Sequence, residues 1–547
     1  MFEKLRTVPL TRIAGALAVI GTVLAASLHV VFAMHAGALW RDEVNSLELA
    51  TVATFSELWA HLDYDSFPAL FFVVLRLFAG VPATASDPQL RLFGLVIGLL
   101  IISALWLNAR ILNWKVPLLS LALVGFNVMV IRYSDSVRAY GMGILLMLLT
   151  FAAIWKVVET PTRRHVAFAA LAAVLSVQCL YYNAMLLFAI CMGGVAVTLR
   201  HRQWRRAVIL LGIGAIAAIS LLPYVPAMQR VQAWNFQFKA DVGFPFYWAK
   251  FSETLGPLHD SSMSKEVWAV VLLFAASIGL GVWALVRKPA AEEEDQSRRD
   301  RVLFALVTLL IGIVSYAGFL KVLSYVTQPW YYILFIAFAA ICIETLFASV
   351  SAKAWPLIVR SVFALVFIGA TAFPTWQELQ KRQTNIDLIA DRLESIAQPE
   401  DLILINTWNY GIPFRRYYSG QTPLATIPPI EDLRFHRCDL VKLRMMSPEP
   451  LAPVLQKIEE TLRAGKTVWL IGTVDFVAPG KQPLVVPPGR DGPRGWEGGA
   501  FYPSWSQQAG FFMQQHALKF ERVQVPLKQP VNRYEHLPLS YFQGWQG

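Results

Sequence analysis

A succession of long apolar runs constrains the fold of this chain more than any other feature of its sequence. A helix needs about 20 predominantly apolar residues to cross a bilayer, and eleven runs reach or approach that length. They cover residues 13–34, 91–109, 116–132, 138–158, 165–181, 183–199, 207–226, 267–286, 302–323, 330–349 and 355–374. The sequence therefore predicts an α-helical polytopic membrane protein.

The composition excludes two other classes of protein. Hydrophobic residues make up 56% of the 547 residues and charged residues only 16%, which excludes a soluble enzyme. The formal net charge is +11, from 48 Lys and Arg against 37 Asp and Glu. These basic residues form short clusters between the apolar runs instead of one patch or tail, so we expect no nucleic-acid partner.

The basic clusters predict the orientation in the membrane. The apolar segment 68–80, only about 13 residues with an arginine inside, is too short for a span and predicts an interfacial helix. With eleven spans and a cytoplasmic N-terminus, the basic clusters fall in the cytoplasm. Residues 31–91, 132–138, 228–265 and everything after 373 are then outside. Cleavage of the first run as a signal peptide would break this agreement, and that run is longer than a signal-peptide core.

We expect two domains. The first is a transmembrane domain over 1–374, whose first outer loop is 31–91, and the second is a soluble outer domain over 375–547. In the second, helix-like stretches over 376–396 and 451–464 precede apolar strands at 402–405 and 467–472. Helix followed by buried strand, twice, predicts an α/β domain. The Pro- and Gly-rich stretch 478–503 predicts a long loop.

The first outer loop contains the strongest candidates for chemistry. Asp42 and Glu43 stand immediately outside the first span. A carboxylate at the membrane surface can take the proton of an acceptor hydroxyl while the lipid part of a donor lies in the bilayer. Partial desolvation is expected to raise the pKa of such a carboxyl toward a useful range. An ordinary hydrated loop is the alternative interpretation.

A second acidic motif follows in the same loop, at Asp63-Tyr64-Asp65. Paired carboxylates can hold Mg²⁺ or Mn²⁺ against a phosphate, although such tripeptides are common by chance. Asp63 and Asp65 are therefore weak candidates for a metal site and, together with His61, candidates for substrate contact. For His61 the alternative is a hydrogen-bonded interfacial residue.

The second outer turn, residues 132–141, combines arginines with tyrosines. Arg138 begins a membrane helix, where a guanidinium can bind a phosphate bidentately and the positive helix end adds to the attraction. Snorkelling to the interface is the alternative. Tyr133 and Tyr140 flank this arginine. Tyr182 and Tyr331, at the outer ends of other spans, fit either an aromatic belt or the lining of a substrate groove.

Several motifs that would indicate other functions are absent. The sequence has no P-loop, no Rossmann glycine pattern after a strand and no His-Glu-x-x-His, so nucleotide-driven pumping and zinc proteolysis lack their signals. Glu344 and Arg360 fall near predicted cytoplasmic helix ends, where we expect them to snorkel to water. An ion-coupled carrier usually depends on buried ionisable groups, and their scarcity here disfavours a carrier.

Three stretches together resemble the bacterial branch of the GT-C glycosyltransferases. The narrower resemblance is to the family 39-like group of protein O-mannosyltransferases and the lipid A aminoarabinose transferase. The stretches read Trp-Arg-Asp-Glu-Val-Asn-Ser-Leu from residue 40, Asp-Ser-Phe-Pro-Ala-Leu-Phe-Phe from residue 65 and Tyr-Ser-Asp-Ser-Val-Arg-Ala-Tyr-Gly from residue 133. The layout agrees over the whole chain, with an acidic first outer loop, many spans and an outer C-terminal domain.

The resemblance implies transfer of a sugar from a polyprenyl-phosphate donor to a glycan, lipid or protein acceptor, with inversion, on the periplasmic face of a bacterial inner membrane. Asp42 aligns with the first-loop Asp of the family and would take the proton of the acceptor hydroxyl. Glu43 would orient Asp42 or bind the acceptor. Arg138, with Tyr133 and Tyr140, would bind the departing lipid phosphate. The wider fold differs in its need for a divalent cation, so Mg²⁺ or Mn²⁺ is a candidate cofactor.

Two departures separate the chain from the aminoarabinose transferases. It has Ser66-Phe67-Pro68 where many relatives have His-Pro-Pro, and it lacks the Arg-Tyr that follows Asp-Glu in those enzymes. These differences argue against aminoarabinose and leave a hexosyl or a pentosyl group open. The alternative function is a non-enzymatic transporter or export component for lipid-linked glycans.

Reporter fusions test the predicted orientation. A reporter placed after Lys115 and another placed after Asp295 should both report the cytoplasm, because the positive-inside assignment puts both loops there. An outward-facing signal from either fusion would contradict the count of eleven spans.

Overall fold

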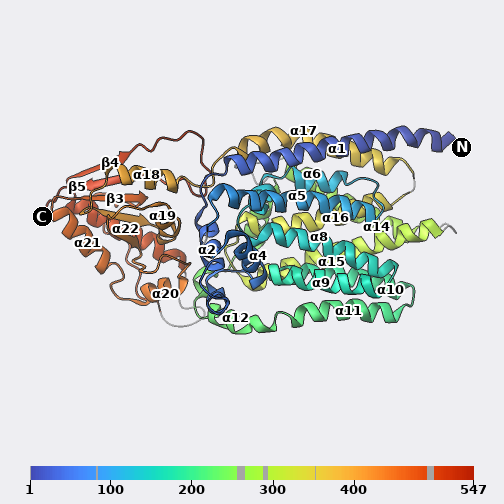
Figure 1. Cartoon of the computed structure of the whole chain (residues 1–547), viewed down its shortest axis with the longest axis horizontal. Helices are drawn as coiled ribbons and strands as arrows, with labels where there is room; N and C mark the ends of the chain where they lie inside the picture. The colour runs from blue at the N-terminus through green and yellow to red at the C-terminus, as the bar shows by residue number, and fades with distance from the viewer. Residues whose placement is uncertain (1, 82–83, 256–264, 288–292, 352, 490–497) are drawn as a thin grey trace.

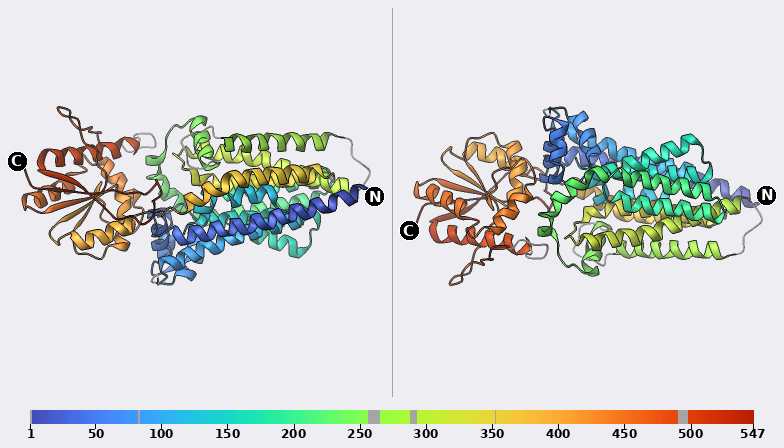
Figure 2. Two further views of the ribbon diagram at one scale, coloured as in Figure 1. Left: turned by 90° about the horizontal axis from the view of Figure 1, so that it is seen from above. Right: turned by 90° about the horizontal axis from the view of Figure 1, so that it is seen from below.

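In the computed structural model of the chain, a bundle of long helices occupies one end and an α/β domain the other (Figure 1). The structure describes residues 2–81, 84–255, 265–287, 293–351, 353–489 and 498–547. The N-terminus lies at the end of the bundle away from the α/β domain. The short helices of the first outer loop lie where the two parts meet (Figure 2).

Within the described residues, eight helical segments are long and apolar enough to cross a membrane. They contain α1 (Phe2–His35), α5 (Asp87–Ile111), α8 (Ala139–Glu159), α10 (Asn183–Arg200), α11 (Trp204–Ile219), α14 (Lys265–Val286), α15 (Glu293–Leu323) and α17 (Trp355–Leu379). The other three predicted runs form shorter helices in the same bundle: α6 (Leu118–Gly125) with α7 (Val128–Ser134), α9 (Arg163–Cys179) and α16 (Ile333–Ser349). The polytopic helical fold is confirmed, and the count of eleven stays a prediction.

The predicted run 116–132 is interrupted because Asn127 caps a new helix. Its side-chain Oδ1 accepts hydrogen bonds from the backbone N–H of Met129 and of Val130, at 2.9 and 3.0 Å. These are donors that a helix start leaves unsatisfied. The Asn127 amide in turn donates to the Thr254 carbonyl at 2.8 Å. The cap therefore starts α7 at a fixed position and directs it toward the second outer turn.

Small residues set the closest helix contacts in the bundle. A Cβ at Gly193 of α10 would lie 2.0 Å from the Thr308 Oγ1 of α15 and 2.7 Å from the Phe304 carbonyl oxygen. No side chain fits there, so glycine allows the two backbones to approach as closely as they do.

The first outer loop folds into α2 (Arg41–Ala50), α3 (Phe55–Ala60), the 3-10 turn η1 (Leu62–Tyr64) and α4 (Ala69–Ala79). Helix α4 is the short apolar helix expected over 68–80. After α11 the chain forms η2 (Leu222–Tyr224), α12 (Val225–Gln232), η3 (Asn235–Phe238) and α13 (Phe244–Leu255). The 3-10 turn η4 (Pro329–Tyr331) precedes α16.

The segments predicted to share one side of the membrane meet at one end of the bundle. Arg132 of the second outer turn donates to the side chain of Gln383 at 2.6 Å, and the Gln383 backbone N–H donates to the Ala36 carbonyl at 2.8 Å. Residues far apart in sequence are thus joined on the end that faces the α/β domain (Figure 1). The side of the membrane that this end faces stays a prediction.

The α/β domain is a five-stranded sheet with helices on both faces. Its strand order is β2-β1-β3-β5-β4, with β1 parallel to β2 and β3, and β5 antiparallel to β3 and β4. The elements are α18 (Ile386–Ile396), β1 (Leu402–Asn406), η5 (Trp408–Tyr410), α19 (Gly411–Tyr417), β2 (Leu424–Ile427), α20 (Cys438–Met446), α21 (Ala452–Arg463), β3 (Thr467–Gly472), α22 (Gly498–His516), β4 (Lys519–Val523) and β5 (Leu539–Gln543). The predicted α/β class is confirmed.

Alternation along the strands divides the helices between the two faces of the sheet. Ile403 and Ile405 of β1 pack with α18 and α19, whereas Leu402 and Leu404 belong to the core that contains α21 and α22. The predicted strands at 402–405 and 467–472 are confirmed. The predicted helix over 376–396 is divided, because α17 ends at Leu379 and α18 begins at 386.

The prediction of a loop over 478–503 was wrong at its C-terminal end. Helix α22 begins at Gly498 and contains Pro503. Pro503 is the sixth residue of α22, beyond the first turn whose N–H groups have no intrahelical partner, so the helix lacks one backbone hydrogen bond there. Residues 473–489 have no regular helix or strand, and 490–497 lie outside the described residues.

The expectation that Glu344 and Arg360 snorkel to water was also wrong. Both side chains are buried, and Arg360 Nε donates to Glu344 Oε1 at 2.6 Å. Ser120 donates to the other carboxylate oxygen from its backbone N–H at 2.7 Å and from its hydroxyl at 3.1 Å. The pair joins α6, α16 and α17, since internal partners replace the water that each charge would otherwise need.

Removal of one member of this pair should destabilise the bundle. We expect Glu344→Gln to lower stability by roughly 3–5 kcal/mol, because it leaves the Arg360 charge buried without its counter-ion. Thermal unfolding of the purified protein in detergent measures the loss.

The matched control is Glu159→Gln, which removes a carboxylate from the partly exposed Lys156–Glu159 pair at the end of α8. Exposed pairs of this kind contribute only about 0–1 kcal/mol. Equal destabilisation by the two substitutions would contradict the assigned role of Glu344.

Candidate functional site

The two adjacent acids at the start of α2 point in different directions. Successive side chains of a helix are rotated by about 100°, so Asp42 and Glu43 cannot face the same surroundings. Glu43 Oε2 accepts a hydrogen bond from the backbone N–H of Trp40 at 3.1 Å and thereby closes the first turn of α2. Trp40 packs edge-on against Tyr133 and Trp330, with ring centroids 5.9 and 5.6 Å apart.

Glu43 is turned inward and is fully occupied. Arg91 of α5 donates to both of its carboxylate oxygens, at 2.5 and 3.0 Å. The backbone N–H of Val137, in the turn before α8, donates to Oε1 at 2.8 Å. Glu43 is completely buried. Glu43 therefore joins α2, α5 and the second outer turn.

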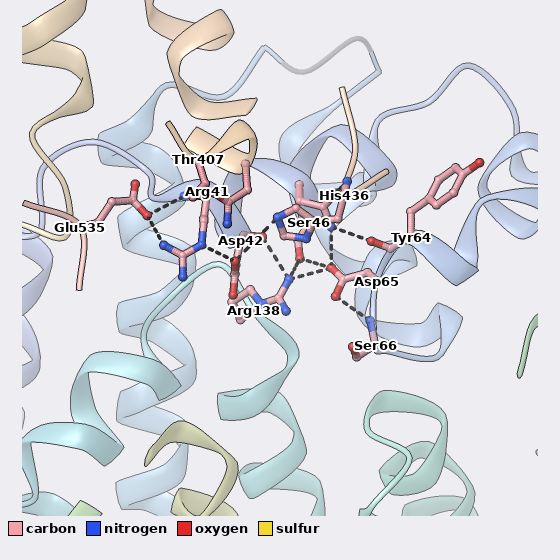
Figure 3. A network of polar contacts seen from close by, with 12 residues as sticks. Arg41, Asp42, Ser46, Tyr64, Asp65, Ser66, Arg138, Thr407, His436 and Glu535 are labelled. Atoms are coloured by element: carbon pink, nitrogen blue, oxygen red, sulfur yellow. Dashed lines mark hydrogen bonds and ion pairs between the residues drawn. The ribbon is translucent and has the colours of Figure 1, made fainter. Parts of the chain in front are cut away.

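Asp42 is turned toward a cavity of about 360 Å³ between the bundle and the α/β domain. Its Oδ1 lies 3.5 Å from Arg41 Nε and 3.8 Å from His436 Nε2. Among the described residues, none donates a hydrogen bond to its carboxylate at 3.5 Å or less. Figure 3 shows it with Arg138 and His436 nearby. The Asp42 carboxylate therefore lies at a cavity and can accept a hydrogen bond from a ligand there.

The environment lowers the pKa of Asp42, contrary to the expectation from desolvation. Burial alone would raise this pKa, but the neighbouring charges of Arg41, Arg138 and His436 outweigh it. Asp42 is consequently ionised at neutral pH, which is the form in which a carboxylate can accept a proton.

Arg138 is held beside Asp42. One of its terminal nitrogens donates to Asp65 Oδ2 and to the Ser46 hydroxyl, each at 2.7 Å, and to the Asp42 carbonyl at 3.0 Å. The guanidinium carbon lies 4.3 Å from the centre of the Phe67 ring. The Nε of Arg138 is buried and has no hydrogen-bond partner among the described residues. Part of the binding capacity of this cation thus remains free for an anion.

The two carboxylates of the Asp63-Tyr64-Asp65 motif do not come together. Asp63 pairs with Arg230 of α12 at 3.0 Å, whereas Asp65 pairs with Arg138 at 2.7 Å. Among the described residues, no group of three or more His, Cys, Asp or Glu side chains is arranged to hold a metal ion. The motif therefore does not fit the divalent-cation site suggested for it, and the cation requirement stays a prediction.

Two of the predicted residues have packing contacts. The His61 ring stacks on Tyr64 with centroids 5.5 Å apart, and its Nδ1 is buried without a partner among the described residues. Tyr133 is almost fully buried against Trp40. His61 and Tyr133 thus have packing contacts with aromatic residues of the first outer loop.

The other three tyrosines lie near Arg138. The Tyr140 ring centre lies 5.9 Å from the guanidinium carbon of Arg138. Tyr182 stacks with Tyr331, with centroids 6.5 Å apart. The Tyr182 hydroxyl is buried and has no partner among the described residues.

No pattern in the sequence indicated that the α/β domain contributes to this site. The backbone N–H of His436 donates to Asn45 Oδ1 at 2.8 Å, and the imidazole Nε2 of His436 lies 3.8 Å from Asp42 Oδ1. Glu535 accepts a hydrogen bond from Arg41 at 3.1 Å. His436 is 391 positions from Asn45, and Glu535 is 494 positions from Arg41. No motif spacing could have linked residues so far apart in sequence. Arg41 was visible only as part of the Trp-Arg-Asp-Glu motif.

Burial changes the charge states of these two residues. It raises the pKa of Glu535 to about 7, although the nearby Arg41 acts in the opposite direction. It lowers the pKa of His436, against the attraction of Asp42. At neutral pH the imidazole is accordingly mainly neutral, and Glu535 is near the midpoint of its titration.

The fold and this cavity define a polytopic membrane protein with a polar site between its helical bundle and an α/β domain. No protein-family model matches the chain, and no curated protein matches it significantly. The fold is similar to ArnT from Cupriavidus metallidurans in the apo state, with a TM-score of 0.49 and 15% identity over 82% of this chain and 92% of that chain.

Two further solved structures have similar folds. The Archaeoglobus fulgidus oligosaccharyltransferase gives a TM-score of 0.43 and 14% identity over 75% of this chain and 62% of that chain. The arabinofuranosyltransferase AftD from mycobacteria gives 0.44 and 14% over 97% and 40%. Fold similarity of this degree assigns no residue and no substrate.

The raised pKa of Glu535 predicts a pH dependence of stability. A carboxyl whose folded-state pKa lies above its ordinary value of 4.5 loses its relative stabilisation as the pH rises from about 4.5 to about 7. Glu535→Gln, which can still accept from Arg41, should therefore gain stability relative to wild type over that interval. The gain should be a few kcal/mol, since one pKa unit corresponds to about 1.4 kcal/mol.

Thermal unfolding of both proteins across this pH range measures the difference. Glu449→Gln, at an exposed position before α21, serves as the control. A difference between wild type and Glu535→Gln that does not vary with pH would contradict the prediction.

Proposed function

We propose that this chain is a membrane glycosyltransferase that uses Asp42 as its general base. The observation that carries the proposal is that, of the four acids singled out in the first outer loop, only Asp42 lines a cavity without accepting a hydrogen bond from a described residue. Glu43, Asp63 and Asp65 are each held by an arginine at 3.0 Å or less. The resemblance of the sequence to the GT-C glycosyltransferases supports the same reaction class.

In this reaction an acceptor hydroxyl in the cavity attacks the anomeric carbon of a sugar bound to a polyprenyl phosphate. The new C–O bond forms as the bond from carbon to the phosphate oxygen breaks, so the configuration inverts. The proton of the hydroxyl passes to Asp42, and the bonding electron pair leaves with the phosphate. No external energy source is needed, because the bond to the phosphate supplies the driving force.

Arg138 would stabilise the departing phosphate. It precedes α8 directly, so a phosphate bound there lies at the end of the bundle while its polyprenyl chain extends into the bilayer. A cation that is already held in place by Asp65 and Ser46 needs little reorganisation as negative charge develops on the leaving group. Tyr140, Tyr182 and Tyr331 lie near Arg138 and are suited to contact the donor there.

The cellular setting of the proposal follows from the basic clusters and the resemblance. The active site and the α/β domain face the periplasm of a bacterial inner membrane. The transferred group is a hexosyl or pentosyl residue.

Asp42→Asn tests the proposal. The amide cannot accept the proton, so release of free polyprenyl phosphate from a synthetic polyprenyl-phosphate sugar should fall by roughly 10²–10⁴-fold. Product formation by the purified protein in nanodiscs is measured together with its thermal unfolding, which should be unchanged.

The matched control is Glu48→Gln, on the same helix. The Glu48 side chain is 32% exposed, and its ion pair with Arg415 is long, at 3.5 Å. Removal of this carboxylate should therefore leave turnover unchanged. Wild-type turnover by Asp42→Asn would overturn the role of Asp42, and inactivity of both wild type and variants would favour the transporter alternative.

A further inference from the structure

The cavity beside Asp42 has a second wall, which the transfer of a sugar to a hydroxyl does not by itself explain. From the bundle side, Arg41, Asp42 and Phe238 line it. The α/β domain supplies the opposite wall, which contains Thr407, Trp408, Asn409, His436 and Tyr502. Figure 3 places Thr407 and His436 above Asp42, on the side away from the transmembrane helices.

The loop that carries Thr407, Trp408 and Asn409 occupies a special position in the sheet. It follows β1 and leads to α19 on one face, whereas the chain after the neighbouring strand β3 leads to α22 on the other face. Connections that diverge in this way leave a crevice at the carboxyl ends of parallel strands, where ligands of open α/β sheets bind. The topology of the domain thus points independently to the place where the cavity lies.

Close contact between β1 and β3 holds the crevice in shape. Asn406, the last residue of β1, donates from its side chain to the Thr473 carbonyl at 2.5 Å. Gly472 has a φ of +89°, and a Cβ there would lie 1.9 Å from the Asn406 carbonyl oxygen. A side chain at this position would therefore force the two strand ends apart.

The wall itself combines aromatic surface with neutral polar groups. Trp408 is nearly buried, and its indole N–H donates to the Tyr502 hydroxyl at 3.4 Å, so the two rings support each other. The Thr407 hydroxyl donates to Asn409 Oδ1 at 2.5 Å. This bond leaves the Asn409 amide N–H groups without a partner among the described residues.

We propose that this cavity is the acceptor site and that the acceptor is a neutral carbohydrate. A sugar presents C–H groups on one face, which pack on an aromatic ring, and hydroxyls at its edge, which pair with amide and hydroxyl side chains. A volume of about 360 Å³ lies at the small end of the range for ligand pockets and suits one or two sugar rings. The inference rests on the proposed function, since Asp42 in the same cavity is the base for the acceptor hydroxyl.

The charges that line the cavity favour a neutral sugar over an anionic one. Among the described residues that line the cavity, Arg41 is the only arginine, and it already contacts both Glu535 and Asp42, at 3.1 and 3.5 Å. His436 lies 3.8 Å from Asp42 and is held there through its backbone. Neither basic group is left over for a phosphate or carboxylate of the acceptor.

The experiment measures saccharide binding and sugar transfer separately. Saturation-transfer NMR on the full chain in nanodiscs uses methyl glycosides of neutral hexoses and pentoses and their disaccharides. Transfer is measured from a radiolabelled polyprenyl-phosphate sugar to the same saccharides, to octapeptides containing Ser and Thr, and to a long-chain alcohol in the nanodisc. The variants are Trp408→Leu and Asn409→Ala, with Gln456→Ala on the exposed face of α21 as the control.

We expect saturation of the protons on one face of a saccharide, and its loss in Trp408→Leu. For that saccharide, both cavity variants should raise the acceptor KM at least ten-fold, while Gln456→Ala should not change it. Asn409→Ala keeps the test valid if Trp408→Leu does not fold. Binding of polyprenyl phosphate should be the same in all variants.

Transfer only to a peptide or to the alcohol would overturn the carbohydrate assignment and leave the proposed transferase function intact. Saccharide binding that depends on Trp408, without transfer to any acceptor, would overturn the transferase function and retain the binding site. Absence of saccharide binding in wild type, or binding unaffected by both cavity variants, would overturn this inference.

Discussion

The buried ion pair between Glu43 and Arg91 is the contact on which the candidate site depends. It fixes the first turn of α2 against α5, and through Val137 it also fixes the turn that carries Arg138. Breaking a buried pair costs about 3–5 kcal/mol, because one charge is left without a partner. Because the ion pair turns the Glu43 side chain inward, the neighbouring Asp42 side chain points toward the cavity. The accessibility of the Asp42 carboxylate is thus a consequence of the pairing of Glu43 with Arg91.

The site is shared between two parts of the chain that a membrane topology alone would separate. The bundle supplies Asp42 and Arg138, and the α/β domain supplies His436 and Glu535. Arg41 and Arg138 lie beside Asp42 and are cations at neutral pH, whereas His436 is mainly neutral there. The nearby positive charge keeps Asp42 ionised, because it outweighs the effect of desolvation on the pKa of Asp42.

Patterns that depend on local sequence were readable in advance. The apolar runs, the strands at 402–405 and 467–472 and the position of Asp42 and Arg138 outside the long apolar helices follow from periodicity and charge. The sequence could not show which of two adjacent acids faces the cavity, since the partner that decides it, Arg91, is distant in sequence. Nor could it show that Arg360 meets Glu344 inside the bundle, because snorkelling and pairing use the same residue types in the same pattern.

The loop after β1 stands opposite Asp42 but is anchored in a different domain. Changes in that loop would reshape the far wall of the cavity without disturbing the base, which the bundle holds through Glu43. Variation of ligand preference on a fixed scaffold is what surface loops allow in many folds. In an architecture of this kind, the loop of the α/β domain can change and alter which ligand is bound. The reacting groups, which the bundle holds, stay constant.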